Sequence, residues 1–245
     1  MILTVTFPET ADIETSSEDY ARRFSGNVGR WFLEIQERAT LDMLAALPQA
    51  KTILDVGGGH GQLAPALVNA GYNVTILGSD AICKKRVANL VDRGQCKFEV
   101  GNILDLPYPD QSFDVVISYR LLPHVTRWQE YLAELSRVAR TAVLLDYPEV
   151  RSINYISPLL FTVKKNLEGN TRPFTCFKAK ELAAEFKKHG FMASKRYPEF
   201  FLPMVLHRKL NTVGISSVLE RLCRIIGLTG WLGSPVILQV IREGK

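Results

Sequence analysis

The residues best placed to do chemistry are one aspartate and four glycines within LDVGGGHGQLA, residues 54–64. Asp55 lies near the end of an apolar run, and glycines follow at positions 57, 58, 59 and 61. A glycine lets bare backbone approach a ligand, because a Cβ would occupy the same space. The stretch therefore predicts a strand, a ligand-binding turn and the start of a helix.

Two classes of ligand suit this turn. Residues 59–64 satisfy G-x-G-x-x-A, and Asp80 lies near the distance expected of a ribose-binding acid, a pattern that suits NAD. However, Asp55 would repel a pyrophosphate and attract an ammonium or a sulfonium. A later block, VGNILDLPYPDQSFDVVIS, places Asn102 just past a strand end, where an amide can hydrogen-bond an adenine edge. The chain also ends in two strands that can pair antiparallel, so a dinucleotide is disfavoured.

Composition and charge narrow the class of protein. The balance of 30 Lys+Arg against 25 Asp+Glu gives a net charge of +5, too small and scattered to indicate nucleic acid. No cysteine pair or Cys/His cluster has zinc-ligand spacing, so we expect no structural metal. We see neither a secretory signal nor an apolar stretch of spanning length, and therefore expect a cytoplasmic protein.

Strands and helices alternate through the middle of the chain. We expect strands at 52–56, 72–77, 96–101, 113–119 and 141–147, with helices at 62–71, 81–94 and 127–140. A helix at 178–190 precedes two apolar strands at 191–201 and 234–243. Strict alternation with continuously apolar strands predicts an α/β fold, a doubly wound Rossmann-like sheet with helices on both faces.

The chain divides into four segments. Residues 1–47 form an N-terminal arm or lid, extended over 1–15 and helical from 17 with breaks at Gly26 and Gly29. Residues 48–147 form the ligand-binding core, and 148–177 form an insertion. Residues 178–245 complete the core and carry an amphipathic segment at 214–227.

The quoted motifs resemble those of the class I S-adenosylmethionine (SAM) dependent methyltransferases. The similarity is to the small-molecule branch, methyltransferase type 11, which includes quinone- and lipid-methylating enzymes. LDVGGGHGQLA resembles the first motif, GNILDLPYPDQSFDVVIS the adenine-side block and fourth strand, and the tail the closing β-hairpin. The resemblance implies a seven-stranded sheet in the order 3-2-1-4-5-7-6 with strand 7 antiparallel. It also implies SAM as cofactor and S-adenosylhomocysteine (SAH) as product.

The resemblance implies roles for individual residues around the cofactor. Asp55 would meet the methionine ammonium, and Ser118 would line the methionine end. Asn102 would accept a hydrogen bond from the adenine amino group, with Ile103 offering its backbone N–H. The backbone approaches the cofactor at the glycines of the turn, Gly57, Gly58, Gly59 and Gly61.

This sequence departs from the family's pattern at two positions. The family places a ribose-binding acid at the tip of the second strand, where this chain has Gly78 and carries Asp80 two residues later. The ribose would therefore meet either Asp80 or backbone at Gly78. Asn102 stands where the family usually has Asp, and its amide oxygen accepts the same bond without charge.

Methyl transfer from a sulfonium needs alignment and dehydration, and a general base when the acceptor is a hydroxyl or phenol. His124, in SYRLLPHVTRW after the fourth strand, is the candidate base, with a capping role as the alternative. Tyr119 and Arg120 either orient the acceptor or serve the structure.

The insertion is the candidate lid over an acceptor pocket, because it is long for a plain connection. Aromatic side chains would wall an apolar pocket, and Arg172 would bind an acidic or carbonyl group; the alternative is that the aromatics pack the insertion onto the sheet. These aromatic residues are Tyr147, Tyr155, Phe161, Phe174 and Phe177.

The segment 214–227 has an apolar face with basic flanks. Such a helix can lie on a membrane or cover an apolar substrate, but packing onto the sheet explains it as simply, and we favour packing.

We predict a SAM-dependent methyltransferase acting on a small apolar or aromatic acceptor, without nucleic acid and with peripheral lipid contact as an option. The alternatives are a SAM-binding partner protein that has lost its acceptor site, and an RNA or protein methyltransferase. Against the latter, LLPH stands where an NPPY-type tetrapeptide would follow the fourth strand.

Overall fold

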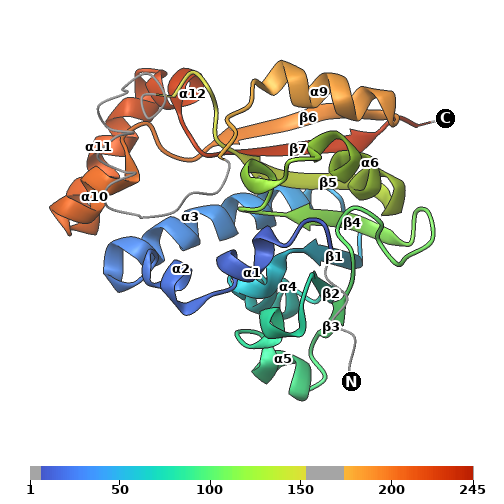
Figure 1. Ribbon diagram of the computed structural model, residues 1–245. Helices are drawn as coiled ribbons and strands as arrows, with labels where there is room; N and C mark the ends of the chain where they lie inside the picture. The colour runs from blue at the N-terminus through green and yellow to red at the C-terminus, as the bar shows by residue number, and fades with distance from the viewer. Residues whose placement is uncertain (1–6, 153–173, 245) are drawn as a thin grey trace.

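The computed structural model describes residues 7–152 and 174–244, and its centre is one seven-stranded sheet. The strand order is β3-β2-β1-β4-β5-β7-β6, as predicted (Figure 1). All neighbouring pairs are parallel except those of β7, which runs antiparallel to both β5 and β6. The strands are β1 (Thr52–Val56), β2 (Asn73–Gly78), β3 (Lys97–Val100), β4 (Phe113–Ser118), β5 (Ala139–Tyr147), β6 (Phe191–Pro198) and β7 (Val236–Arg242).

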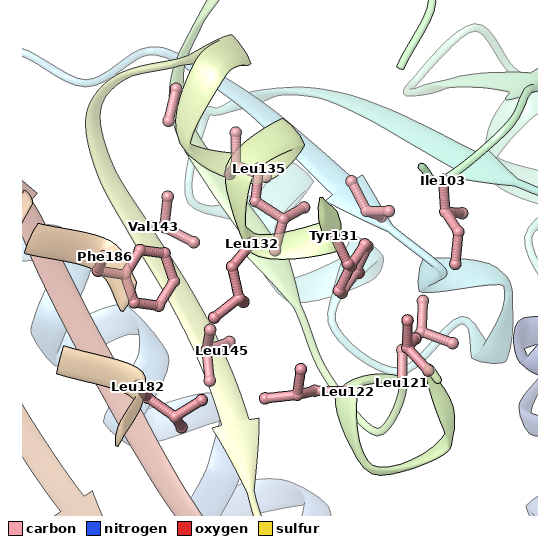
Figure 2. Packing of buried hydrophobic residues seen from close by; sticks show 14 of the residues in the cluster. Ile103, Leu121, Leu122, Tyr131, Leu132, Leu135, Val143, Leu145, Leu182 and Phe186 are labelled. Carbon is pink, nitrogen blue, oxygen red and sulfur yellow. The ribbon is translucent and has the colours of Figure 1, made fainter. Parts of the chain in front are cut away.

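Helices cover both faces of the sheet because its central strands are apolar on both sides. Successive residues of a strand point to opposite faces. Accordingly Leu54 and Val116 pack with α6 (Trp128–Val138) and α9 (Ala179–Lys188), in the cluster that Figure 2 shows. Ile53 and Val115 pack on the other face, where the helices are α3 (Gly26–Ala45), α4 (Ala64–Asn69) and α5 (Ala88–Asp92).

The N-terminal arm differs from the prediction. The expectation of extended chain over 1–15 is wrong where the structure describes it, because Ala11–Thr15 form a helix, α1, followed by α2 (Glu18–Arg22). Five residues do not form a stable helix by propensity alone. Tertiary burial holds α1 in place: the side chains of Asp12 and Thr15 are 0% and 2% exposed. Such contacts leave no periodic signal in a five-residue segment.

One predicted helix is divided. In place of a helix over 81–94, the structure has a 3-10 turn, η2 (Ala81–Lys84), and then α5. The Asp80 side chain accepts a hydrogen bond from Ile82 N at 2.8 Å and caps η2. Two further 3-10 turns follow the strands β1 and β4, namely η1 (Gly58–His60) and η3 (Leu122–His124).

The C-terminal helices also correct an expectation. The amphipathic segment forms α11 (Val213–Ile225), between α10 (Met204–Leu210) and α12 (Leu228–Leu232). Packing of its apolar face onto the sheet, the interpretation favoured from the sequence, is wrong. Ile225 and Ile226 are 70% and 68% exposed, so this face points to solvent.

Candidate active site

The glycine turn lies at the carboxyl end of β1, in the centre of the sheet. Gly57 and Gly61 have φ of +77° and +70°, a left-handed conformation that favours glycine. Gly57 N donates to Leu77 O at 2.8 Å, which ties the turn to the end of β2. The turn therefore sits where open α/β sheets bind their ligands.

Buried polar atoms gather around this turn without hydrogen-bond partners among the residues that the structure describes. They are both carboxylate oxygens of Asp55, Nε2 of His60, Oε1 of Gln62, Oγ of Ser16 and Nη1 of Arg120. Buried polar groups are almost always paired in folded proteins, so each exception needs an explanation. A polar ligand at the turn would pair them.

Burial controls the charge of the groups at the turn. Asp55 is fully buried, and desolvation raises the pKa of its carboxyl to about 7. Desolvation, with the Arg120 and Arg86 guanidinium groups nearby, lowers the pKa of His60 to about 3, so His60 is neutral. A ligand ammonium would stabilise the Asp55 carboxylate, and a ligand carboxylate would accept from Arg120. These groups match the ends of an amino-acid zwitterion.

The tip of β2 is occupied by an acid from elsewhere in the chain. Asp12 of α1 accepts hydrogen bonds from Ser79 N at 2.6 Å and from Ser79 Oγ at 2.5 Å. Cys83 Sγ lies 3.5 Å from the same carboxylate. Asp80, the residue predicted to bind ribose, uses its side chain to cap η2. Sequence reasoning missed Asp12, because it lies 67 residues from its partner.

Residues 9–16, here called the strap, cross the glycine turn. At one end Glu9 accepts from Thr126 N at 2.8 Å and from Arg127 N at 3.2 Å. At the other, Ser16 Oγ lies 2.5 Å from where a Cβ on Gly59 would be. Protein side chains thus occupy the space over the turn, and a ligand there requires the strap to shift.

The residues predicted on the adenine and methionine sides have internal partners. Asn102 Oδ1 accepts from Leu104 N at 3.0 Å, and Ile103 is fully buried. Ser118, the last residue of β4, is fully buried with its Oγ 2.5 Å from the hydroxyl of Tyr131. Gly78 is the last residue of β2, the strand tip at which the sequence analysis placed it.

The three residues predicted to act on the acceptor lie in different surroundings. The Tyr119 side chain is fully buried, with its hydroxyl 2.9 Å from Thr40 Oγ1, and burial raises the pKa of this phenol well above its usual value. This contact gives Tyr119 a packing role. His124 ends η3, and its ring centroid lies 5.7 Å from that of Phe174.

Arg120 belongs to a polar cluster that sequence reasoning missed. Its backbone N donates to Asp146 Oδ1 at 2.6 Å, and its Nη2 donates to Gln36 Oε1 at 2.8 Å. Gln36 Nε2 donates in turn to Asp146 Oδ2 at 3.3 Å and to Glu199 Oε1 at 3.2 Å. The four residues come from α3 and from the carboxyl ends of β4, β5 and β6, so only the topology brings them together.

The carboxyl groups of this cluster are hard to ionise. Burial raises the pKa of Asp146 to about 6. Burial, with the negative charge of Asp146 adding to it, raises the pKa of Glu199 to about 8. At neutral pH Glu199 therefore carries a proton beside the guanidinium of Arg120.

The predicted acceptor residues are only partly described. Tyr147 is fully buried, and Phe174 is 41% exposed beside His124. Thr175 N donates to Pro123 O at 2.9 Å, so the last residues of the insertion are attached to η3. Phe177 is 2% exposed and packs in the core. Tyr155, Phe161 and Arg172 lie outside the described residues.

The described residues contain neither a metal-binding cluster nor a membrane-spanning helix. Over 7–152 and 174–244, no three His, Cys, Asp or Glu side chains are grouped to hold a metal ion. In the same ranges, no helix has the length and apolar character needed to cross a bilayer.

Residues 54–145 match the family model for a methyltransferase domain, and this range runs from within β1 to within β5 and includes the glycine turn. This central part of the chain has the sequence pattern of a methyltransferase domain. The similarity to class I SAM-dependent methyltransferases of the small-molecule branch is therefore confirmed, with SAM as the cofactor of that class.

Curated relatives match part of the chain. A fatty-acid O-methyltransferase of Mycolicibacterium smegmatis is 33% identical over 111 residues, 42% of this chain and 38% of the relative. The 2-methyl-6-phytyl-1,4-hydroquinone methyltransferase of Synechocystis is 36% identical over 104 residues, 42% of this chain and 33% of the relative. The chain thus spans well under half the length of these relatives.

A solved structure matches nearly the whole chain. Magnesium protoporphyrin IX methyltransferase of Synechocystis, crystallised with bound SAH, superposes with a TM-score of 0.63 at 16% identity. The superposition covers 94% of this chain and 96% of that one. At this identity the likeness shows the fold.

Proposed function

We propose that this protein transfers a methyl group from SAM to a small apolar or aromatic acceptor. The observation that carries the proposal is the set of buried polar atoms around the glycine turn that have no hydrogen-bond partner in the part of the chain that the structure describes, above all those of Asp55 and Arg120. SAM carries an amino-acid zwitterion, and the two side chains complement its two charged ends.

The residues of the turn would hold and orient the cofactor. The Asp55 carboxylate would pair with the ammonium, and Nη1 of Arg120 would donate to the carboxylate. Main-chain atoms at Gly57 and Gly59 would lie against the cofactor, since neither residue has a side chain to prevent it. The bound cofactor supplies an electrophilic methyl group; the protein supplies alignment and a site without water.

His124 is the group proposed to accept a proton from the acceptor. It follows β4 at the carboxyl edge of the sheet, and its ring contacts Phe174 at the end of the insertion. A base at this place would lie between the cofactor end of β4 and the insertion that is proposed to cover the acceptor. A hydroxyl or phenol acceptor would need such a base.

An apolar acceptor is supported by the relatives and by the chain. The two curated relatives are named for a fatty acid and a phytyl hydroquinone. The insertion here contains the apolar run ISPLLFTV, residues 156–163. Peripheral contact with lipid is part of the proposal, because acceptors of this class partition into bilayers.

The first test is calorimetric titration with SAH, with NADH titrated into the same preparation. We expect micromolar binding of SAH and none of NADH. Binding of NADH alone would replace the proposal with a dehydrogenase.

The second test supplies SAM with a labelled methyl group to a panel of fatty acids, quinols and apolar phenols. We expect transfer to one class of acceptor, and loss of transfer with retained SAH binding in His124→Ala. Binding of SAH without transfer to any acceptor would favour the non-catalytic SAM-binding partner. Transfer to tRNA fragments or peptides instead would favour the RNA or protein methyltransferase.

A further inference from the structure

The C-terminal helices carry large apolar side chains on their outer surface. On α11, Ile215, Val218, Leu222 and Ile225 recur at spacings of three and four residues, which places them on one side of the helix. Together with side chains of α10 and α12 and of the turn after α11, they form what is here called the apolar face. Its members and their exposed fractions are Val205 42%, Leu206 38%, Ile215 52%, Val218 57%, Leu222 54%, Ile225 70%, Ile226 68% and Trp231 63%.

Buried polar contacts fix this orientation of α11. Ser216 and Glu220, on the inner side, are 0% and 5% exposed. The Glu220 carboxylate accepts from Phe201 N at 2.9 Å and Leu202 N at 2.8 Å, and lies 3.0 Å from His207 Nε2. The helix therefore turns its polar side inward and its apolar side outward, opposite to an ordinary surface helix.

The charges exposed on these helices are all positive. Between residues 200 and 233 the sequence contains one acid, Glu220, which is buried. Lys209 and Arg221 are exposed on α10 and α11. Two copies of this face would bring like charges together, which disfavours a dimer through it. An anionic surface would attract it.

The geometry matches that of helices lying in a bilayer surface. Figure 1 shows α10, α11 and α12 grouped at one end of the molecule, so they can meet a plane together. Trp231 adds an exposed indole, a side chain enriched at the membrane–water boundary. Apolar side chains with basic residues beside them are the pattern of interfacial helices.

We propose that the protein docks on anionic lipid bilayers through the apolar face, with Lys209 and Arg221 contacting lipid phosphates. The bilayer takes up the exposed isoleucine, leucine and tryptophan side chains of α11 and α12. This docking goes beyond the lipid contact of the proposed function, because it assigns that contact to one surface and one lipid charge, and it uses none of the residues around the glycine turn.

The test is co-sedimentation of the full chain with vesicles of phosphatidylcholine containing phosphatidylglycerol at graded fractions. We expect binding that rises with the anionic fraction, weakens with salt and shifts tryptophan emission to the blue. The double variant Ile225→Asp/Ile226→Asp should reduce the vesicle affinity at least tenfold. Lys209→Glu/Arg221→Glu should remove the dependence on anionic lipid.

Met192→Asp is the matched control, because Met192 is 53% exposed on β6, away from the apolar face. Its affinity for vesicles should equal that of the wild type. The proposal is overturned by no wild-type binding, by equal losses in Met192→Asp, or by a solution dimer that Ile225→Asp/Ile226→Asp dissociates. SAH titrations of the same variants should be unchanged, so a failure of docking is separable from a failure of cofactor binding.

Discussion

Burial destabilises the ionised form of the Asp55 carboxyl group. Without a partner among the described residues, its pKa rises to about 7. A cation bound beside it would restore the carboxylate and gain a strong charge-assisted interaction. The residue therefore favours binding of a cationic group at the expense of the stability of the ligand-free protein.

We predict that Asp55→Asn weakens SAH binding by about 100-fold, or ~2–3 kcal/mol, because an amide cannot pair with an ammonium. Thermal unfolding at pH 8 should show no loss of stability, since a buried charge is removed. Calorimetric titration and a thermal melt measure the two effects. Asp110→Asn, at an exposed carboxylate paired with Arg137, is the control and should change neither. Unchanged SAH affinity in Asp55→Asn would remove Asp55 from the cofactor site.

Arg120 offers a second test at the residue scale. Its Nη1 is buried and has no hydrogen-bond partner among the described residues, while Nη2 donates to Gln36. We predict that Arg120→Lys weakens binding of SAH about tenfold and binding of decarboxylated SAH much less, because a lysine cannot hold Gln36 and a ligand carboxylate in the same geometry. Equal losses for both ligands would assign Arg120 a structural role alone.

Among single residues, the sequence predicts those whose type and local spacing have one explanation. The glycines and Asp55 lie within seven positions of each other, and the structure places them at the end of β1 and in the turn that follows it. Asp12 and Glu199 reach the same edge of the sheet from distant segments, and neither belongs to a local motif. Their proximity is a property of the topology, so it appeared only with the structure.

At the scale of elements, the strap is the feature that controls access to the glycine turn. Glu9 and Asp12 attach it at two points, to the start of α6 and to the tip of β2. Hydrogen bonds to a charged group contribute about 1.5–3 kcal/mol each. A cofactor that takes the place of the strap must break at least the contacts of Asp12.

We predict that Asp12→Ala increases the affinity for SAH about tenfold, chiefly through faster association, because less energy is needed to move the strap. Stopped-flow binding measures the rate, and hydrogen exchange at the Ser79 amide reports release of the strap. Asp19→Ala, at an exposed acid of α2 paired with Arg22, is the control. Weaker binding in Asp12→Ala would mean instead that the carboxylate contacts the bound ligand.

The elements differ in how well the sequence predicts them. The alternation of apolar strands and helices predicts a doubly wound sheet. The order of its strands came from the resemblance to the methyltransferase family, and the structure confirms both. The strap was expected to be extended, since its helix depends on burial against the turn. The apolar side of α11 was expected to be buried, because a helical pattern shows which residues share a side and not which side faces inward. The orientation of α11 is fixed by Glu220, which accepts hydrogen bonds from Phe201 N and Leu202 N, 19 and 18 residues away.

For the whole molecule, the buried carboxyl groups make stability depend on pH. The pKa values of Asp55, Asp146 and Glu199 rise to about 7, 6 and 8 in the folded protein, all above their ordinary values. Between the ordinary and the raised pKa of each group, the folded state binds more protons than the unfolded state. The free energy of unfolding therefore falls as pH rises. His60 has the opposite effect on stability, because its pKa is lowered to about 3 in the folded protein. This effect is confined to pH values below the ordinary pKa of 6.5. Above that pH His60 no longer contributes to the slope.

We predict that the ligand-free protein loses on the order of 2 kcal/mol of stability between pH 6.5 and 8.5, or about 5 °C in Tm for a chain of this size. Glu199 has the highest pKa of the three, so Glu199→Gln should remove most of this slope, whereas Glu130→Gln, at an exposed acid paired with Arg127, should leave it intact. Thermal melts across this range test both. A flat profile in the wild type would show that Glu199 ionises freely, either through water reaching the cluster or through a closer contact with Arg120. Saturating SAH should reduce the share of the slope that comes from Asp55, because a bound ammonium lowers the pKa of that carboxyl.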